Sequence, residues 1–90
     1  GLSIPIEDIE YDGSLPAKNN DIIAIDKSEI TITRVTLYDL DGVKKDISIS
    51  YNRNDFKIPE ITGEYLVLID TISNRGTAWY SFKLNVERSE

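Results

Sequence analysis

The 90-residue chain contains no cysteine, no histidine and no methionine. Without cysteine it can form neither a disulfide framework nor a thiolate zinc site. Without histidine it lacks the usual general base and a frequent transition-metal ligand. Without methionine it lacks its own start residue, so we expect Gly1 to be a cleavage scar or the beginning of a domain cut from a longer protein.

Basic residues are scarce as well, because 10 Lys and Arg face 16 Asp and Glu, which gives a net charge of −6. The acidic excess is concentrated in residues 1–26, where six carboxylates face Lys18 alone. An acidic chain without a basic stripe repels phosphate groups, so nucleic acids and anionic membrane surfaces are not expected partners. No apolar run approaches the roughly 20 residues of a membrane-spanning helix, so this segment is not expected to insert into a membrane.

What the chain does have is a long β-hairpin pattern in its last third, residues 64–87. Apolar side chains recur there at every second position, the period of a strand with one buried face: Tyr65, Val67 and Ile69, then Ala78, Tyr80, Phe82, Leu84 and Val86. The turn between the runs, residues 73–76, contains Asn and Gly, which tolerate the positive φ of a tight reversal. Pairing Ile72 with Thr77 sets Tyr65 opposite Leu84, Val67 opposite Phe82 and Ile69 opposite Tyr80. A slip of one residue would turn the polar face inward, so the register is strongly specified.

The rest of the chain consists of short apolar runs separated by turn residues, with no helical period. An edge strand is expected in residues 1–12, where Pro5 interrupts a loose alternation, and a loop in residues 12–20. Further strands are expected at residues 21–25, 30–40, 43–51 and 56–58, with a hairpin turn at Asp41-Gly42. The pattern predicts an all-β fold, an antiparallel β-sandwich of about seven strands, in a single domain of residues 1–90. Residues 1–20 would be its extended acidic strand and loop, and residues 21–87 the sandwich.

The strand expected at residues 30–40 has an irregular phase. Ile30 and Ile32 fall on one face, whereas Val35 and Leu37 fall on the other. Either a β-bulge near Thr33-Arg34 re-aims the strand, or both of its faces are partly covered.

Three segments in the second half of the chain carry a further pattern. They are Phe56-Lys57-Ile58-Pro59, Gly63-Glu64-Tyr65 and the aromatic run Gly76-Thr77-Ala78-Trp79-Tyr80-Ser81-Phe82, preceded by a mid-domain hairpin at Asp39-Leu40-Asp41-Gly42. In these features residues 30–87 resemble the cysteine-free immunoglobulin-like domains of bacterial extracytoplasmic proteins. The resemblance implies an immunoglobulin-like sandwich in a secreted or surface-anchored protein. It also implies a role as a spacer, an adhesive module or a small lipoprotein.

The back of the C-terminal hairpin carries the first candidate binding residues, Leu66, Leu68, Ile72 and Trp79. If the alternating apolar set faces the core, these four side chains project from the opposite face. An exposed patch of this kind would mark a surface for a protein partner, and a surface Trp with Tyr neighbours could also stack on sugar rings. The alternatives are that the N-terminal segment covers this face or that Trp79 fills a rim of the sandwich. Asp70, opposite Trp79, favours those alternatives.

The second candidate is a calcium site at the acidic N-terminal end, built on Asp8, Glu10 and Asp12. In an extended strand these three side chains project from one side. Calcium takes six to eight oxygen ligands, and further ligands could come from Asn19, Asn20, Asp21, Asp39 and Asp41. The alternative is a solvated edge whose charges resist pairing with another sheet.

No catalytic motif is present, and an enzyme is not expected. Serine and lysine occur close together without a histidine base, and the five glycines are scattered rather than gathered in a phosphate-binding loop. The expected function is a non-catalytic structural or protein-interaction domain of a secreted or surface-anchored bacterial protein, without a catalytic cofactor. Its partner would be a protein or a cell-surface polymer. The alternatives are a ligand-binding module, with carbohydrate on the Trp79 face or calcium at the acidic end, and an inhibitor-like domain presenting the loops at residues 52–55 and 73–76.

Overall fold

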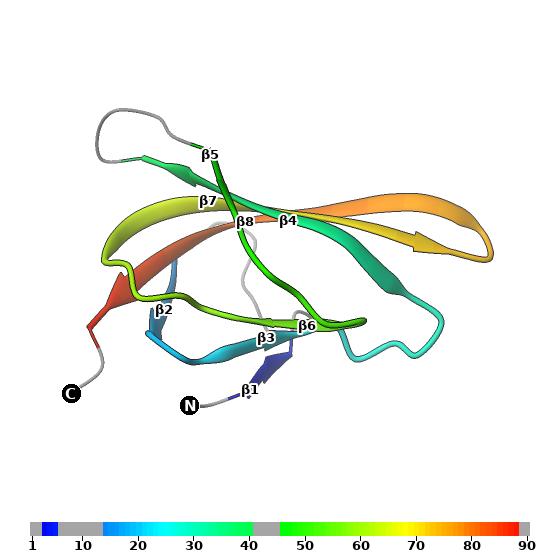
Figure 1. Ribbon diagram of the computed structural model, residues 1–90, viewed down its shortest axis with the longest axis horizontal. Coiled ribbons are helices and arrows are strands. Elements are labelled where there is room, and N and C mark those ends of the chain that lie inside the picture. The colour runs from blue at the N-terminus through cyan, green and yellow to red at the C-terminus, as the bar shows by residue number, and fades with distance from the viewer. Residues whose placement is uncertain (1–2, 6–13, 41–45, 89–90) are drawn as a thin grey trace.

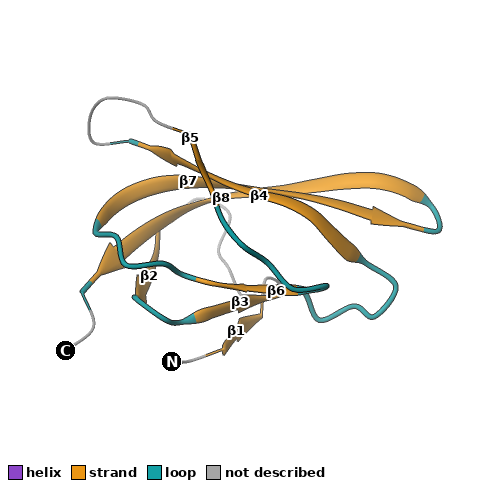
Figure 2. Ribbon diagram, in the orientation of Figure 1, coloured by secondary structure: helices purple, strands orange, loops and turns teal. Residues whose placement is uncertain are grey.

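The computed structural model describes residues 3–5, 14–40 and 46–88, and all regular secondary structure in these ranges is β. The strands are β1 (Ser3–Pro5), β2 (Ser14–Lys18), β3 (Ile22–Ala24), β4 (Thr31–Asp39), β5 (Asp46–Ser48), β6 (Asp55–Lys57), β7 (Gly63–Ser73) and β8 (Gly76–Glu87). The all-β expectation is confirmed for the described residues, and Figure 2 shows strands joined by loops throughout.

The strands form two sheets. The small sheet has the order β1-β3-β6, and the large sheet has the order β2-β8-β7-β4-β5. Most neighbouring strands are antiparallel, but β1 pairs parallel with β3 and β2 pairs parallel with β8. Figure 1 shows the strands of the small sheet running beneath β4, β7 and β8.

Both sheets contribute to one hydrophobic core. From the small sheet and its continuations come Ile23, Ile25, Phe56 and Ile58, each at most 1% exposed. The large sheet contributes the inward side chains of its central strands: Ile32, Val35, Leu37, Tyr65, Val67, Ile69, Phe82, Leu84 and Val86. A domain of this size has little apolar surface to spare, so a large apolar side chain left outside this core is informative.

The C-terminal hairpin has the register that its alternation predicts. Ile72 pairs with Thr77, and the core pairs are Tyr65 with Leu84, Val67 with Phe82 and Ile69 with Tyr80. Phe82 and Leu84 are buried, whereas Tyr80 is half-buried because it lies closer to the turn. The two-residue turn lies at one end of the long axis of the molecule (Figure 1). The residues of β7 and β8 next to this turn therefore extend away from the core.

Gly76 is the one residue of the 73–76 turn with a positive φ, at 115°. The expectation that this glycine supplies the reversal is confirmed, whereas Asn74 keeps an ordinary negative φ. A Cβ atom added at Gly76 would meet no atom within 4 Å. The cost of a substitution here therefore comes from the backbone conformation alone.

We predict that Gly76→Ala lowers the free energy of unfolding by about 1–2 kcal/mol, because an L-residue with a side chain disfavours this φ by that amount. Thermal or urea unfolding measures the loss. Thr77→Ala, which lies next to it in ordinary strand geometry, is the matched control and is expected to stay within about 0.5 kcal/mol of the parent. An unchanged stability of Gly76→Ala would contradict the turn geometry.

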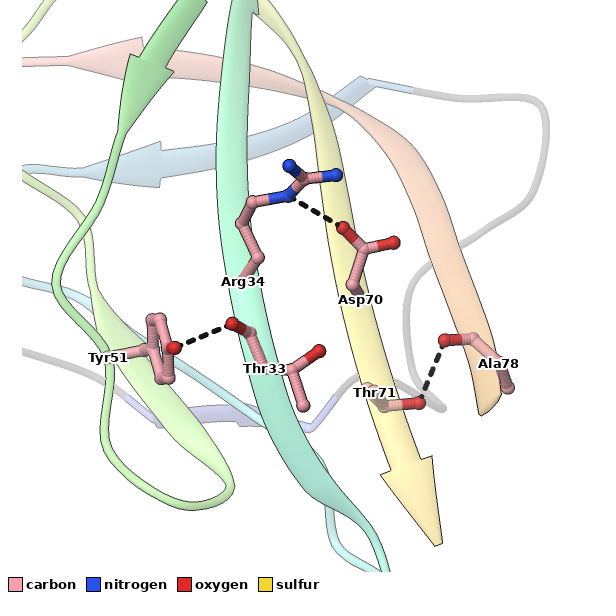
Figure 3. A network of polar contacts seen from close by, with 6 residues as sticks. All are labelled: Thr33, Arg34, Tyr51, Asp70, Thr71 and Ala78. Atoms are coloured by element: carbon pink, nitrogen blue, oxygen red, sulfur yellow. Dashed lines mark hydrogen bonds and ion pairs between the residues drawn. The ribbon is translucent and has the colours of Figure 1, made fainter. Parts of the chain in front are cut away.

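A β-bulge interrupts β4, the first of the two explanations that the irregular phase of its apolar residues leaves open. The pairing with β7 shifts between Ile32 and Arg34, so Thr33 is the extra residue. The shift returns Val35 and Leu37 to the buried face that Ile32 occupies. The carbonyl oxygen of Thr33 accepts a hydrogen bond of 2.6 Å from the Tyr51 hydroxyl (Figure 3).

The expectation of a loop throughout residues 12–20 is wrong for residues 14–18, which form β2. Leu15 pairs with Leu84 and Ala17 with Val86, and their side chains are half-buried and buried. Pro16 is compatible with this strand because β2 lies at the edge of the sheet, where a missing N–H need not be paired. The chain then reverses at Asn20, which has a φ of 71°.

Candidate functional site

The outward face of the large sheet places three chemically distinct side chains in one row. Arg34 on β4 is directly opposite Asp70 on β7, and Asp70 is directly opposite Trp79 on β8. Directly paired residues share a face of the sheet, and adjacent strands are about 4.8 Å apart. The β-bulge brings Arg34 into this row, because the extra residue at Thr33 shifts the strand by one position.

An open hollow of about 480 Å3 surrounds this row, and we call it the Trp79 hollow. It is lined by Thr33, Arg34, Asp70, Thr71, Thr77, Ala78 and Trp79. The indole of Trp79 is prominent among them, because that residue is 67% exposed. Trp is enriched among the residues that dominate binding energy, so an exposed indole beside charged and hydroxyl groups makes this surface the candidate site.

An ion pair joins the other two members of the row. Arg34 Nε donates a 3.0 Å hydrogen bond to Asp70 Oδ2, as Figure 3 shows. The side chains are 65% and 30% exposed, so the pair contributes at most about 1 kcal/mol to stability. Within the described part of the chain, neither Asp70 Oδ1 nor the terminal nitrogens of Arg34 has a protein partner. These groups are available to a ligand.

The floor of the hollow is held by hydrogen bonds between side chains and the backbone. Thr71 is 3% exposed, and its hydroxyl donates a 3.0 Å hydrogen bond to the carbonyl oxygen of Ala78 on the neighbouring strand. Figure 3 shows this bond between β7 and β8. It also shows the bond from the Tyr51 hydroxyl to the Thr33 carbonyl oxygen, on the side of β4 that faces away from β7. The backbone beneath the hollow is therefore tied on both sides of the Arg34–Asp70 pair.

The four binding residues expected from the sequence fall into two groups. Trp79 and Ile72 are 67% and 46% exposed on the outward face of the hairpin. Leu66 and Leu68 share that face but are half-buried, because they lie in the middle of the sheet between β4 and β8.

The sequence pattern did not identify Arg34 as a member of the site. The signal that could have found it was the irregular phase of residues 30–40, because one of its two explanations is the bulge that turns Arg34 outward.

The expected calcium ligands Asp8, Glu10 and Asp12 lie outside the described residues, and so do the Asp41-Gly42 turn and Asp41 as a further ligand. Two other proposed ligands already have backbone partners. Asn19 Nδ2 donates to the carbonyl oxygens of Pro59 and Ile61 at 2.9 and 2.8 Å, and Asp21 Oδ2 accepts the Lys18 N–H at 3.0 Å. Among residues 3–5, 14–40 and 46–88, no group of three or more acidic, histidine or cysteine side chains is arranged to hold a metal ion.

A second hollow, of about 500 Å3, lies beside the turn after β2. It is lined by Asn19, Asn20, Glu60, Ile61, Thr62 and Arg88. Its most buried member, Asn19, holds the β6–β7 connection through the two hydrogen bonds described above. This hollow is therefore part of the scaffold, since the polar group at its base is already used.

A scan against models of protein families, a search of curated proteins and a search of solved structures each found no match to this chain. No helix within the described ranges has the length and apolar character needed to cross a membrane. The chemistry of the Trp79 hollow is accordingly inferred from its own side chains.

Proposed function

We propose that this chain is a non-catalytic binding domain of a secreted or surface-anchored bacterial protein, and that it holds its partner, a protein or a cell-surface polymer, at the Trp79 hollow. The observation that carries the proposal is the exposure of Trp79, the one tryptophan of the chain, beside an ion pair with unused hydrogen-bonding groups. Trp and Arg are enriched among the residues that dominate binding energy.

We further propose that the two sheets form an immunoglobulin-like β-sandwich. The antiparallel order β8-β7-β4-β5 in the large sheet corresponds to the G-F-C-C′ order of variable-type immunoglobulin domains. The connections β3–β4, β5–β6 and β6–β7 each pass from one sheet to the other, as they do in such sandwiches. The parallel pairing of β1 with β3 departs from the antiparallel sheets of that fold.

A binding role is also better supported than catalysis by the chemistry of the hollow. Asp70 is the one carboxylate among the described residues that line it, and that carboxylate is already paired with Arg34. Acid–base catalysis by carboxylates needs a group whose pKa is raised in a water-excluding site. An open hollow on the surface of a sheet excludes little water.

The proposal predicts that Trp79→Ala weakens binding of the domain to envelopes of the organism that encodes it by at least about tenfold. Saturation binding of the fluorescently labelled domain measures this loss. Lys83→Ala is the matched control, because Lys83 is an exposed residue of the same face of β8 and lies outside the hollow. It is expected to bind like the parent.

Circular dichroism and the unfolding midpoint should be the same for both variants and the parent, since neither side chain is part of the core. Equal binding of Trp79→Ala and Lys83→Ala would contradict the proposal, and so would no binding of the parent domain. The second result is the one expected of a pure spacer.

A further inference from the structure

We infer that the ligand of the Trp79 hollow is a neutral glycan chain, an inference that rests on the binding function proposed above. Sugar rings combine an apolar C–H face with hydroxyl groups around the rim. The Trp79 hollow combines a flat apolar indole with charged and hydroxyl groups beside it. The two surfaces are chemically complementary.

Trp79 provides the apolar half of this recognition. Its indole belongs to a residue that is 67% exposed, on a hairpin whose turn lies at one end of the long axis of the molecule (Figure 1). The electron-rich face of an indole attracts the weakly positive C–H groups of a pyranose ring, and the contact also removes apolar area from water. Because the hollow is open, it can cover part of a polymer rather than enclose a small molecule.

The Arg34–Asp70 pair provides the polar half. Each sugar hydroxyl can both donate and accept a hydrogen bond. Two neighbouring hydroxyls can therefore donate to Asp70 Oδ1 and accept from the terminal nitrogens of Arg34, the groups that the protein leaves unused. The 3.0 Å bond between Nε and Oδ2 places the two side chains next to each other on this face of the sheet, so that one ligand can contact both.

Charge and area favour a neutral sugar over other polymers. The chain carries a net charge of −6, which repels an anionic polymer. A stable protein interface buries about 800 Å2 on each partner around an apolar centre. Here Trp79 and Ile72 are the exposed large apolar side chains of the described hairpin, and threonines and an ion pair surround Trp79.

The test compares binding of the labelled domain to three preparations of envelopes from the organism that encodes it. One preparation is untreated, one is digested with a broad protease that is then removed, and one is oxidised with periodate and reduced. Periodate cleaves bonds between neighbouring hydroxyl-bearing carbons and so destroys many glycans. We expect Trp79-dependent binding to survive protease, to fall by at least tenfold after periodate, and to change little between low and high salt.

Two single substitutions test whether the Arg34–Asp70 pair takes part in binding. Asp70→Asn is expected to weaken binding to untreated envelopes about tenfold, because it loses a charged acceptor and loosens Arg34. Glu87→Gln, an exposed carboxylate at the other end of β8, is the matched control and should bind normally.

Binding that depends on Trp79 but is lost with protease and insensitive to periodate would overturn the glycan inference and leave the binding function standing. A strong fall in binding at high salt would overturn the neutral character of the ligand. Absence of Trp79-dependent binding to untreated envelopes would overturn the binding function itself, and the glycan inference with it.

Discussion

Phe56→Ala is expected to lower the free energy of unfolding by about 3–5 kcal/mol, the usual cost of deleting a buried aromatic ring. Phe56 is 1% exposed and is the central residue of β6 in the small sheet. It pairs with Ile23 on β3 and belongs to the same buried cluster as Leu37, Val67 and Leu84 of the large sheet. Removing the ring would leave a cavity between the sheets, and a domain of this size has only about 5–15 kcal/mol of stability in total.

Urea unfolding followed by circular dichroism measures this effect. Lys57→Ala changes the exposed neighbour on the same strand and should stay within about 0.5 kcal/mol of the parent. Phe56→Leu keeps most of the buried volume and should be destabilised clearly less than Phe56→Ala, which provides a measurable variant if the alanine form does not fold. A loss below about 1 kcal/mol for Phe56→Ala would mean that the small sheet does not share a core with the large one.

The second large effect concerns two isoleucines on the same strand. Ile69→Ala is expected to cost about 2–5 kcal/mol, whereas Ile72→Ala is expected to stay within about 0.5 kcal/mol of the parent. Ile69 is fully buried opposite Val35 and Tyr80, while Ile72 is 46% exposed on the other face. The two changes are chemically identical, so a difference in stability reports the difference in burial between the two positions.

The pair of variants therefore measures the register of the hairpin. A one-residue slip would exchange the two faces of β7 relative to the core. Equal destabilisation of the two variants in urea, or a greater loss for Ile72→Ala, would contradict the pairing of Ile69 with Tyr80.

The register of the hairpin could be predicted from the sequence because the residues that fix it lie close together in the chain. A single tight turn fixes the pairing, and strict alternation from Tyr65 to Leu84 then assigns every side chain to a face. The β4 bulge was one of two alternatives, since apolar residues that change phase within one strand need either an extra residue or a second covered face. Arg34 and Asp70 meet only through the pairing of β4 with β7, which joins residues 36 positions apart and is set by neither local feature.

The parallel pairing of β2 with β8 was not predictable in the same way. Leu15 and Leu84 lie far apart in the sequence, and no turn sets their register. Pro16 and the surrounding turn residues favour a loop when only their own sequence is considered. They form a strand because β2 lies at the edge of the large sheet, where the missing N–H of a proline need not be paired. The half-burial of Leu66 and Leu68 was likewise set by tertiary neighbours, because their place in the middle of the sheet is not visible in the hairpin pattern.

A binding role for the Trp79 hollow requires that the indole of Trp79 stands open to solvent in the folded protein. Fluorescence of the unliganded protein tests it directly, because Trp79 is the sole tryptophan. We predict a red-shifted emission and a rate of quenching by acrylamide close to those of the urea-unfolded chain. A blue-shifted emission that is protected from acrylamide until the protein unfolds would show that Trp79 is covered, and would contradict a binding role for the Trp79 hollow.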